Sequence, residues 1–194
     1  MKKYKIGRIH LWFILLFIGG VGCKKILEEI NPSAITIENY FQTASQAEAS
    51  INGIYPMLQT FTNATGRAGE MVWASIEMPV GHSNTQIVYN SDLINHRSAA
   101  FDPAFRILWQ AFYKGIANAN VAIERIPMVE MNEIRKKNLL GEAHFLRAFY
   151  YYYLVRLYGN VPLIAETISF SSPNLYPERS PIENVYDFIS VLML

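Results

Sequence analysis

Two long stretches with helical periodicity, separated by only about five residues, constrain this chain more than any other feature. The first covers residues 102–126, opens with an Asp-Pro pair that suits a helix N-terminus, and is stopped by Pro127. The second covers residues 132–158 and ends at Gly159, with Pro162 shortly after it. Such a short connection forces the two helices to run antiparallel. The sequence therefore predicts an αα-hairpin as the core of the chain.

One face of each predicted helix is apolar at helical spacing. In the first helix this face consists of Trp109, Phe112, Ile116, Ala119, Ile123 and Ile126. In the second it consists of Leu139, Ala143, Leu146, Tyr150, Tyr153 and Leu157. Burial of these side chains contributes on the order of 10 kcal/mol before the entropy cost. We therefore expect the two faces to pack on each other.

An earlier helix is predicted from residue 43 onward. Two overlapping capping boxes could start it, Thr43 with Gln46 or Ser45 with Glu48. Gly53 and Pro56 predict a kink or a break near its end.

The last predicted helix opens at Ser180-Pro181, and no cap, charge or glycine closes it before residue 194. A hairpin followed by an unterminated apolar helix is typical of the start of a helical-repeat array. The expected fold is all-α, with tetratricopeptide-like helical hairpins, a long irregular segment over residues 62–101, and an incomplete C-terminus.

The N-terminus has the order of a secretory signal. Four basic residues precede the apolar run 11–18, which is followed by small residues and by Cys23, the single cysteine. The uncharged stretch is shorter than the roughly 20 residues that span a bilayer. We expect residues 1–22 to be a lipoprotein signal peptide, with Cys23 acylated, residues 23–38 a tether, and residues 39–194 the helical domain. An ordinary signal peptide with an incidental cysteine is the alternative.

Composition and charge exclude several classes of protein. Hydrophobic residues make up 51% of the chain, which is too many for a disordered protein. The formal charge is +1, and without residues 1–22 the acidic residues outnumber the basic ones by three. A chain without a basic surface is a poor partner for phosphate backbones, so no nucleic-acid binding is expected.

Several stretches together resemble one family, the SusD/RagB-like outer-membrane lipoproteins of Bacteroidetes. The similar segments include residues 23–32, 36–41, 47–55 and 109–120. The most specific are Gly-Glu-Ala-His-Phe-Leu-Arg-Ala-Phe-Tyr at 141–150 and Leu-Val-Arg-Leu-Tyr-Gly-Asn-Val-Pro-Leu at 154–163. Members of this family continue well beyond the length of this chain, which indicates a truncated copy.

This resemblance implies a function as well as a fold. Such proteins are lipid-anchored at the outer membrane and exposed at the cell surface. They sit as a lid on a TonB-dependent, SusC-like transporter and capture oligosaccharides, or in some branches peptides, without chemistry on them. Glu142 and Arg147 recur in the family pattern. Five residues apart on a helix, they cannot pair with each other, and we expect them to hold neighbouring elements together rather than to bind ligand. Gly159 and Pro162 are expected to be structural too.

Residues 62–101 carry the groups that sugar capture needs, aromatic faces and forked hydrogen-bonding side chains. The candidate ligand-binding residues are Trp73, Tyr89, Asn90, Asp92, Asn95 and Arg97, with His96 among them. The alternative for Trp73 is a packing role under the loop.

Catalysis has little support in the sequence. The mature histidines, His82, His96 and His144, are too far apart for a recognised metal-ligand spacing. No nucleophile elbow is present, and no catalytic residue, cofactor or metal is predicted. Glycan capture is therefore the first hypothesis. The alternatives are capture of peptides and a lipid-anchored helical scaffold with no small ligand, and an enzyme ranks last.

Overall fold

A computed structural model describes the chain from residue 36 onward with several gaps. The N-terminal segment Met1–Thr36 and the compact unit Ile37–Leu194 form separate units. The described residues are 36–61, 80–81, 95–97, 103–169, 172–173 and 175–192.

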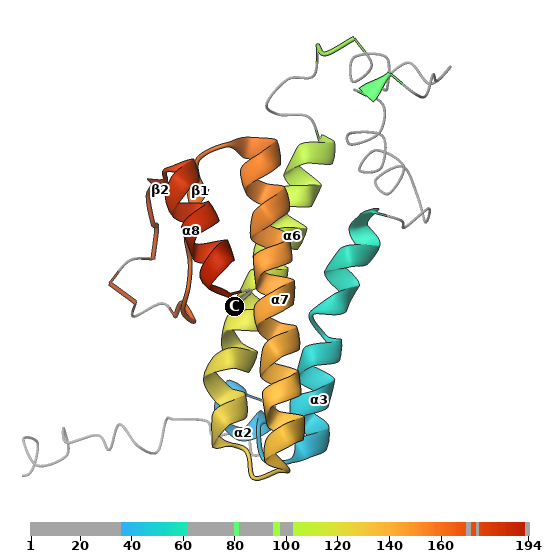
Figure 1. Cartoon of the computed structure of the whole chain (residues 1–194), viewed down its shortest axis with the longest axis vertical. Coiled ribbons are helices and arrows are strands. Elements are labelled where there is room, and N and C mark those ends of the chain that lie inside the picture. The colour runs from blue at the N-terminus through green and yellow to red at the C-terminus, as the bar shows by residue number, and fades with distance from the viewer. Residues whose placement is uncertain are drawn as a thin grey trace, which may run out of the picture. The chain divides into compact units, whose positions relative to one another are not determined.

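Two long helices, α6 (Pro103–Arg125) and α7 (Glu133–Tyr158), lie side by side along the unit (Figure 1). Their short connection makes them antiparallel, so the predicted hairpin is confirmed. The first helix ends one residue earlier than expected. Pro127 then lies inside a 3₁₀ turn, η4 (Ile126–Met128), because proline tolerates the first turn of a new helix.

Both ends of α7 have local chemistry typical of helix termini, and the end at Gly159 is the one that the sequence predicted. The Asn132 side chain accepts hydrogen bonds from the backbone N–H groups of Ile134 and Arg135 at 3.0 and 3.1 Å. At the other end Gly159 has a φ of 69° and donates its N–H to Val155 O. A side chain is strained at that φ, so glycine suits this helix end.

The N-terminal elements lie along the same hairpin. They are α2 (Ile37–Tyr40), α3 (Ala44–Asn52) and the 3₁₀ helix η2 (Tyr55–Phe61). Helix α2 includes the last two residues of the segment expected to be a tether. Thr43 and Gln46 form a complete capping box at the start of α3, and α3 stops before Gly53 as predicted.

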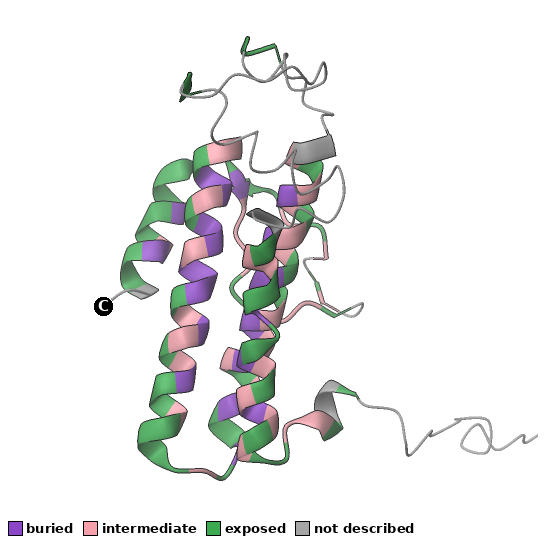
Figure 2. Cartoon of the chain, turned by 90° about the vertical axis from the view of Figure 1, so that its right-hand side faces the viewer, coloured by how far each residue is buried: buried purple, intermediate pink, exposed green. Residues whose placement is uncertain are grey.

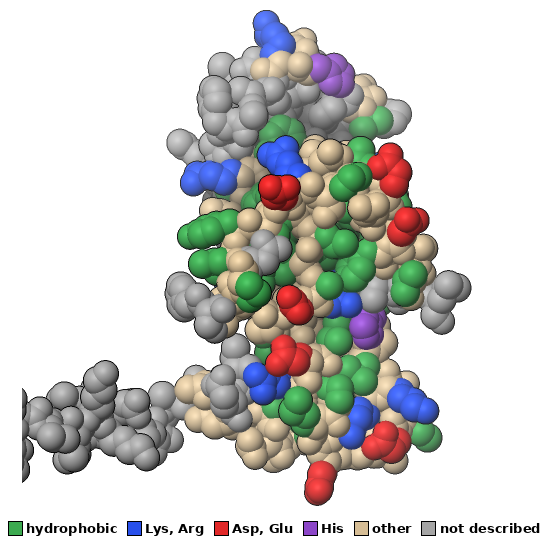
Figure 3. Space-filling view, turned by 90° about the vertical axis from the view of Figure 1, so that its left-hand side faces the viewer, with side chains coloured by type: hydrophobic (Ala, Val, Ile, Leu, Met, Phe, Trp, Pro, Cys, Tyr) green, Lys and Arg blue, Asp and Glu red, His purple; other side chains and the backbone are tan. Residues whose placement is uncertain are grey.

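The C-terminal part crosses back over the hairpin. Strand β1 (Val161–Pro162) pairs antiparallel with β2 (Arg179–Ser180). Helix α8 (Ile182–Leu192) follows and packs against α7. Figure 3 looks onto this side of the unit, where exposed hydrophobic side chains lie among acidic ones; those of α8 include Ile182, Tyr186 and Val191.

The core lies between α6, α7 and the helices on either side of them. Most residues of the two predicted apolar faces are buried, while Trp109, Ile123, Tyr153 and Leu157 are half-buried. Figure 2 shows the buried positions along the facing sides of the helices. Burial on α7 is wider than predicted and also covers Arg147, Ala148, Tyr151, Leu154 and Val155. These residues are buried because α8 and residues 162–166 cover a second face of α7.

Candidate functional site

Most of the residues predicted for lipidation and ligand binding fall outside the described part of the chain. Cys23, Trp73, Tyr89, Asn90 and Asp92 belong to this group. Asn95 and Arg97 are described, and both are exposed in a short turn. Between them His96 has a positive φ of 54°. The ligand-binding and lipidation roles of all these residues stay predictions.

Side chains of α6 and α7 form hydrogen bonds to the backbone of an extended segment, residues 162–166, which we call the strap. Tyr113 donates its hydroxyl hydrogen to Pro162 O at 2.7 Å. The hydroxyl of Tyr151 donates to Ile164 O at 3.0 Å and accepts from the N–H of Ile164 at 2.7 Å. Burial raises the pKa of Tyr151 to about 12, so this phenol stays protonated at neutral pH.

Asn120, on α6, also binds the backbone of the strap. Its Nδ2 donates to Ile164 O at 3.0 Å and to Glu166 O at 2.9 Å. Its side chain is buried, so the two carbonyl groups find in it the donors that water would otherwise supply.

Arg147, on α7, binds both Asn120 and the strap. Its Nη1 donates to Asn120 Oδ1 at 2.7 Å and to Ala165 O at 2.9 Å. The guanidinium carbon lies 5.0 Å from the centre of the Phe188 ring on α8, a cation-π distance. Arg147 is only 4% exposed, and burial lowers the pKa of its guanidinium. The charge is therefore held by carbonyl dipoles and a ring, since the ion pairs found among the described residues do not involve it.

Glu142 also reaches another element. It accepts a hydrogen bond from the Tyr55 hydroxyl of η2 at 3.3 Å, while Arg147 points to α6, the strap and α8. The two residues thus contact different parts of the unit and not each other, as their spacing on α7 requires. Their assignment as structural rather than ligand-binding residues stays a prediction.

Gly159 and Pro162 position the start of the strap. Gly159 ends α7 with its positive φ, and Pro162 pairs with Arg179 across the small sheet while its carbonyl accepts from Tyr113. Proline removes a donor from the chain but leaves this carbonyl available.

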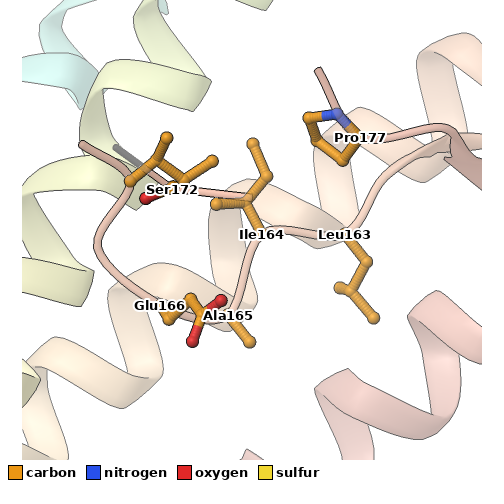
Figure 4. Close-up of a pocket in the computed structure, with 7 residues that line it drawn as sticks. Leu163, Ile164, Ala165, Glu166, Ser172 and Pro177 are labelled. Atoms are coloured by element: carbon orange, nitrogen blue, oxygen red, sulfur yellow. The ribbon is translucent and has the colours of Figure 1, made fainter. Parts of the chain in front are cut away.

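A small pocket opens on the outer side of the strap (Figure 4). Its lining residues are Leu163, Ile164, Ala165, Glu166, Ile168, Ser172 and Pro177. The Ile164 side chain lies between Ser172 and Pro177, whereas Leu163 points the opposite way. The volume is about 50 Å³, room for a few water molecules, whereas pockets for drug-sized ligands measure about 300 Å³ or more. This pocket is too small for a sugar residue.

The hydrogen bonds from α6 and α7 to the strap were not predicted from the sequence. One signal could have found Asn120, since it lies beside Ala119 on the buried side of an amphipathic helix, where an amide needs a partner. Tyr113 and Tyr151 gave no such signal, because tyrosines with helical spacing are equally typical of a core.

The described residues contain no group of three or more His, Cys, Asp or Glu side chains arranged to hold a metal ion. Among the helices described, none has the length and apolar character needed to cross a membrane.

The fold and the hydrogen bonds to the strap define a class of protein, a helical-hairpin scaffold in which a few buried polar side chains position an extended segment. The comparisons identify the family. Residues 25–193 match a family model described as starch-binding and associating with the outer membrane, the SusD-like family. This chain belongs to that family, and its mostly helical fold is the tetratricopeptide-like arrangement expected.

The most similar relatives include two from Formosa agariphila. The SusD-like protein P38 is 31% identical over 97% of this chain and 36% of its own length, and the SusD-like protein P2 is 30% identical over the same shares. The chain therefore spans about a third of the length of these relatives.

Solved structures agree on the fold. A laminarin-binding SusD-like protein matches with a TM-score of 0.65 and 24% identity, over 78% of this chain and 33% of its own. The surface glycan-binding protein A of Bacteroides fluxus matches with a TM-score of 0.60 and 21% identity, over 78% and 32%. These TM-scores support a common fold.

Proposed function

We propose that this protein is a cell-surface lipoprotein that captures oligosaccharides at the outer membrane and passes them to a TonB-dependent, SusC-like transporter. The observation that carries the proposal is the match of residues 25–193 to a family described as starch-binding and associating with the outer membrane. Two solved relatives bear names that state laminarin or glycan binding. In this proposal the protein binds its ligand and does no chemistry on it.

The residues proposed for ligand contact lie between η2 and α6. Trp73 and Tyr89 would stack on the apolar faces of pyranose rings, and the side chains of Asn90, Asp92, Asn95 and Arg97 would bond the hydroxyl groups. Of these, Asn95 and Arg97 are exposed in the described part of the chain, which is compatible with ligand contact.

Affinity electrophoresis of the full chain in gels containing laminarin or starch tests glycan capture. Retarded migration in one of the gels, but not in a gel without polysaccharide, is the expected result. Trp73→Ala should reduce the affinity obtained from the retardation at least about tenfold, the loss expected for a central aromatic contact. Tyr176→Ala is the matched control, because Tyr176 is 89% exposed and lies outside the proposed segment. Its migration should equal that of the wild type.

Circular dichroism separates binding from folding in the same variants. If Trp73→Ala loses helical signal together with retention, Trp73 is a packing residue. If neither polysaccharide nor any other glycan retards the wild-type chain while a peptide mixture is bound, glycan capture is wrong and peptide capture takes its place.

The lipid anchor has its own test. Cys23→Ala should move the protein from the outer-membrane fraction to a soluble fraction, because stable anchoring depends on acyl chains. Metabolic labelling with a clickable fatty acid should mark the wild type only. An unchanged membrane fraction for Cys23→Ala would contradict the anchor.

Co-purification of a TonB-dependent transporter with the wild type from solubilised outer membranes is expected if the partner is correct.

A further inference from the structure

The turn that joins α6 to α7 exposes two large hydrophobic side chains. We call residues 126–134, from the start of η4 to the first turn of α7, the hairpin tip. Met128 and Ile134 are each 72% exposed, a value that only Tyr176 exceeds among the large hydrophobic residues described. A single exposed hydrophobic residue is ordinary, but two of them in one short turn form a candidate contact surface.

The hairpin tip is held in place by its own contacts. Ile126 and Val129 are buried in the core, and the Val129 N–H donates to Ile126 O at 3.1 Å. Lys136 Nζ donates to Pro127 O at 3.3 Å, which ties the start of α7 to η4. The two exposed side chains therefore belong to an ordered turn, so a contact made there costs little conformational entropy.

The local structure does not explain a hydrophobic residue at position 134. Asn132 is the N-cap of α7, and Ile134 lies in the first helical turn with its N–H donating to the Asn132 side chain at 3.0 Å. The positive end of the helix dipole favours acidic side chains in this turn, as at Glu133. The exposed Ile134 side chain serves neither the cap nor the core. An apolar partner outside the chain would supply the burial that the chain itself does not.

The hairpin tip lies at the end of the unit where the chain enters it. The unit starts with α2 at Ile37, and both views place α2 at the tip end (Figures 1 and 2). The ion pair of Arg135 Nε with Glu48 Oε1, at 2.9 Å, joins the start of α7 to α3, the helix that follows α2. The other end of the hairpin lies about 39 Å away, the length of a 26-residue helix.

The tip end is also the end to which the lipid anchor is attached. Cys23 precedes Ile37 by 14 residues, and a chain of that length spans at most about 50 Å. Acyl chains on Cys23 therefore keep the start of the unit within this distance of the membrane. Tethering of this kind gives an effective concentration in the millimolar range, so a weak apolar contact can still be occupied.

The charges around the tip cancel, so the tip has no net charge that would recruit a charged partner. The three basic side chains of this region are Arg135, Lys136 and Lys137, and the three acidic ones are Glu48, Glu130 and Glu133. Arg135 pairs with Glu48 at 2.9 Å and Lys136 with Glu133 at 3.2 Å. Paired charges cost less to bring out of water than isolated ones. The two apolar side chains would therefore drive the contact, with little dependence on salt.

We propose, on the basis of the lipid anchor proposed above, that the hairpin tip is a second membrane contact in which Met128 and Ile134 enter the lipid surface near the acylated Cys23. Interfacial segments bury their apolar side chains about 5–10 Å deep, at the boundary of headgroups and acyl chains. The contact orients the unit as well as holding it close to the membrane. Helix α6 begins at the opposite end, shortly after the segment 62–101 proposed for ligand contact, so that end faces away from the lipid.

A fluorescent probe at residue 128 of the lipidated full chain tests the depth of the tip. Acylation uses the thiol of Cys23, the only cysteine in the sequence, so Met128→Cys adds the single free thiol. The chain is labelled with a maleimide dye and reconstituted into phosphatidylcholine vesicles that contain a phosphatidylcholine with a nitroxide on its acyl chain. Quenching should be at least about threefold stronger than for Arg106→Cys, an exposed position on α6 about 29 Å from the tip end.

A second substitution separates insertion from folding. Ile134→Asp in the labelled Met128→Cys chain should reduce quenching to the level of the Arg106→Cys probe, because a carboxylate resists transfer out of water. Aspartate suits the first turn of α7, so the melting temperature should stay equal or rise. Val191→Asp is the matched control, because Val191 is also 72% exposed but lies on α8, and it should leave the quenching unchanged.

Failure of the membrane contact and failure of the lipid anchor give different results. Two labelled thiols per Met128→Cys chain, with the protein free of vesicles, would show that Cys23 is not acylated and would overturn both. One labelled thiol with equal quenching at residues 128 and 106 would overturn the membrane contact alone. Quenching at residue 128 that Ile134→Asp leaves unchanged would overturn it as well.

Discussion

Asn120 and Arg147 lie on different helices of the hairpin and meet in its interior, where Arg147 Nη1 donates to Asn120 Oδ1 at 2.7 Å. The same two side chains hold the carbonyl groups of Ile164, Ala165 and Glu166. One buried contact thus fixes the register of α6 against α7 and the course of the strap. The hydrogen bonds of Asn120 and Arg147 depend on each other, because a change of rotamer in either side chain leaves a buried polar atom without its partner.

Asn120→Leu should lower the free energy of unfolding by about 2–4 kcal/mol, since it leaves a carbonyl and an arginine N–H without their partner. Urea unfolding followed by circular dichroism measures the loss. Asn118→Ala is the matched control on the same helix, because Asn118 makes one hydrogen bond, to Gly53 O at 3.2 Å, at an exposed site. It should cost less than about 1 kcal/mol.

A double-mutant cycle tests the coupling. Arg147→Met alone should also destabilise, but its combination with Asn120→Leu should cost less than the sum of the two, because each single variant already breaks the shared bond. Strict additivity would show that the two residues act independently.

Gly115→Ala should destabilise the hairpin although alanine is the better helix former. A Cβ at Gly115 would clash with the ring of Tyr150, at 2.8 Å from its Cδ2, and this buried ring also donates its hydroxyl hydrogen to Ile54 O at 2.7 Å. Overpacking of this kind costs about 1–3 kcal/mol. Gly141→Ala is the control, since it meets no atom and should stabilise the chain by up to about 1 kcal/mol. Thermal melts of the two variants should shift in opposite directions.

The sequence was sufficient for the parts of this fold that depend on local chemistry. The hairpin, the end at Gly159 and most of the two apolar faces follow from periodicity and end signals, and the structure confirms them. These features need no knowledge of distant residues, because each depends on neighbours within a turn or two of helix.

The rest depended on contacts between distant residues. The burial of Arg147, Tyr151 and Val155 could not be read from one periodic stripe, because it results from α8 and the strap, which lie far away in the chain. A charged residue at such a position looks like a surface residue until its partners are known. The candidate ligand residues of the 62–101 segment have no periodicity at all, so composition was their only signal.

The choice between the two overlapping capping boxes also needed the structure, and it yields a prediction. Thr43 caps α3, with Gln46 N donating to Thr43 Oγ1 at 3.3 Å and Thr43 N to Gln46 Oε1 at 2.9 Å. Thr43→Ala should therefore cost about 1 kcal/mol of unfolding free energy. Ser45→Ala, inside the first turn, should change it by less than about 0.5 kcal/mol. The reverse order in chemical denaturation would assign the cap to Ser45.

His144 should make the stability of the unit depend on pH. Its pKa is lowered from 6.5, first by burial and then by the charge of Arg147, whose Nη2 lies 3.4 Å from His144 Nδ1. In the unfolded chain the imidazole takes up a proton near pH 6.5, whereas the folded state resists it until a lower pH. The unfolded state thus binds more protons in this window, and stability rises with pH there.

Acidification from pH 7.5 to 5.5 should therefore lower the free energy of unfolding, with a slope from this one group of at most about 1.4 kcal/mol per pH unit. His144→Gln cannot ionise but keeps an oxygen that accepts from Arg147, so it should flatten the dependence over this range. Asn118→Ala is the matched control, because it removes no ionisable group, and it should leave the wild-type slope unchanged. Urea unfolding at each pH gives the slopes. An equal slope for His144→Gln and the wild type would show that protonation of His144 beside Arg147 does not cause the pH dependence.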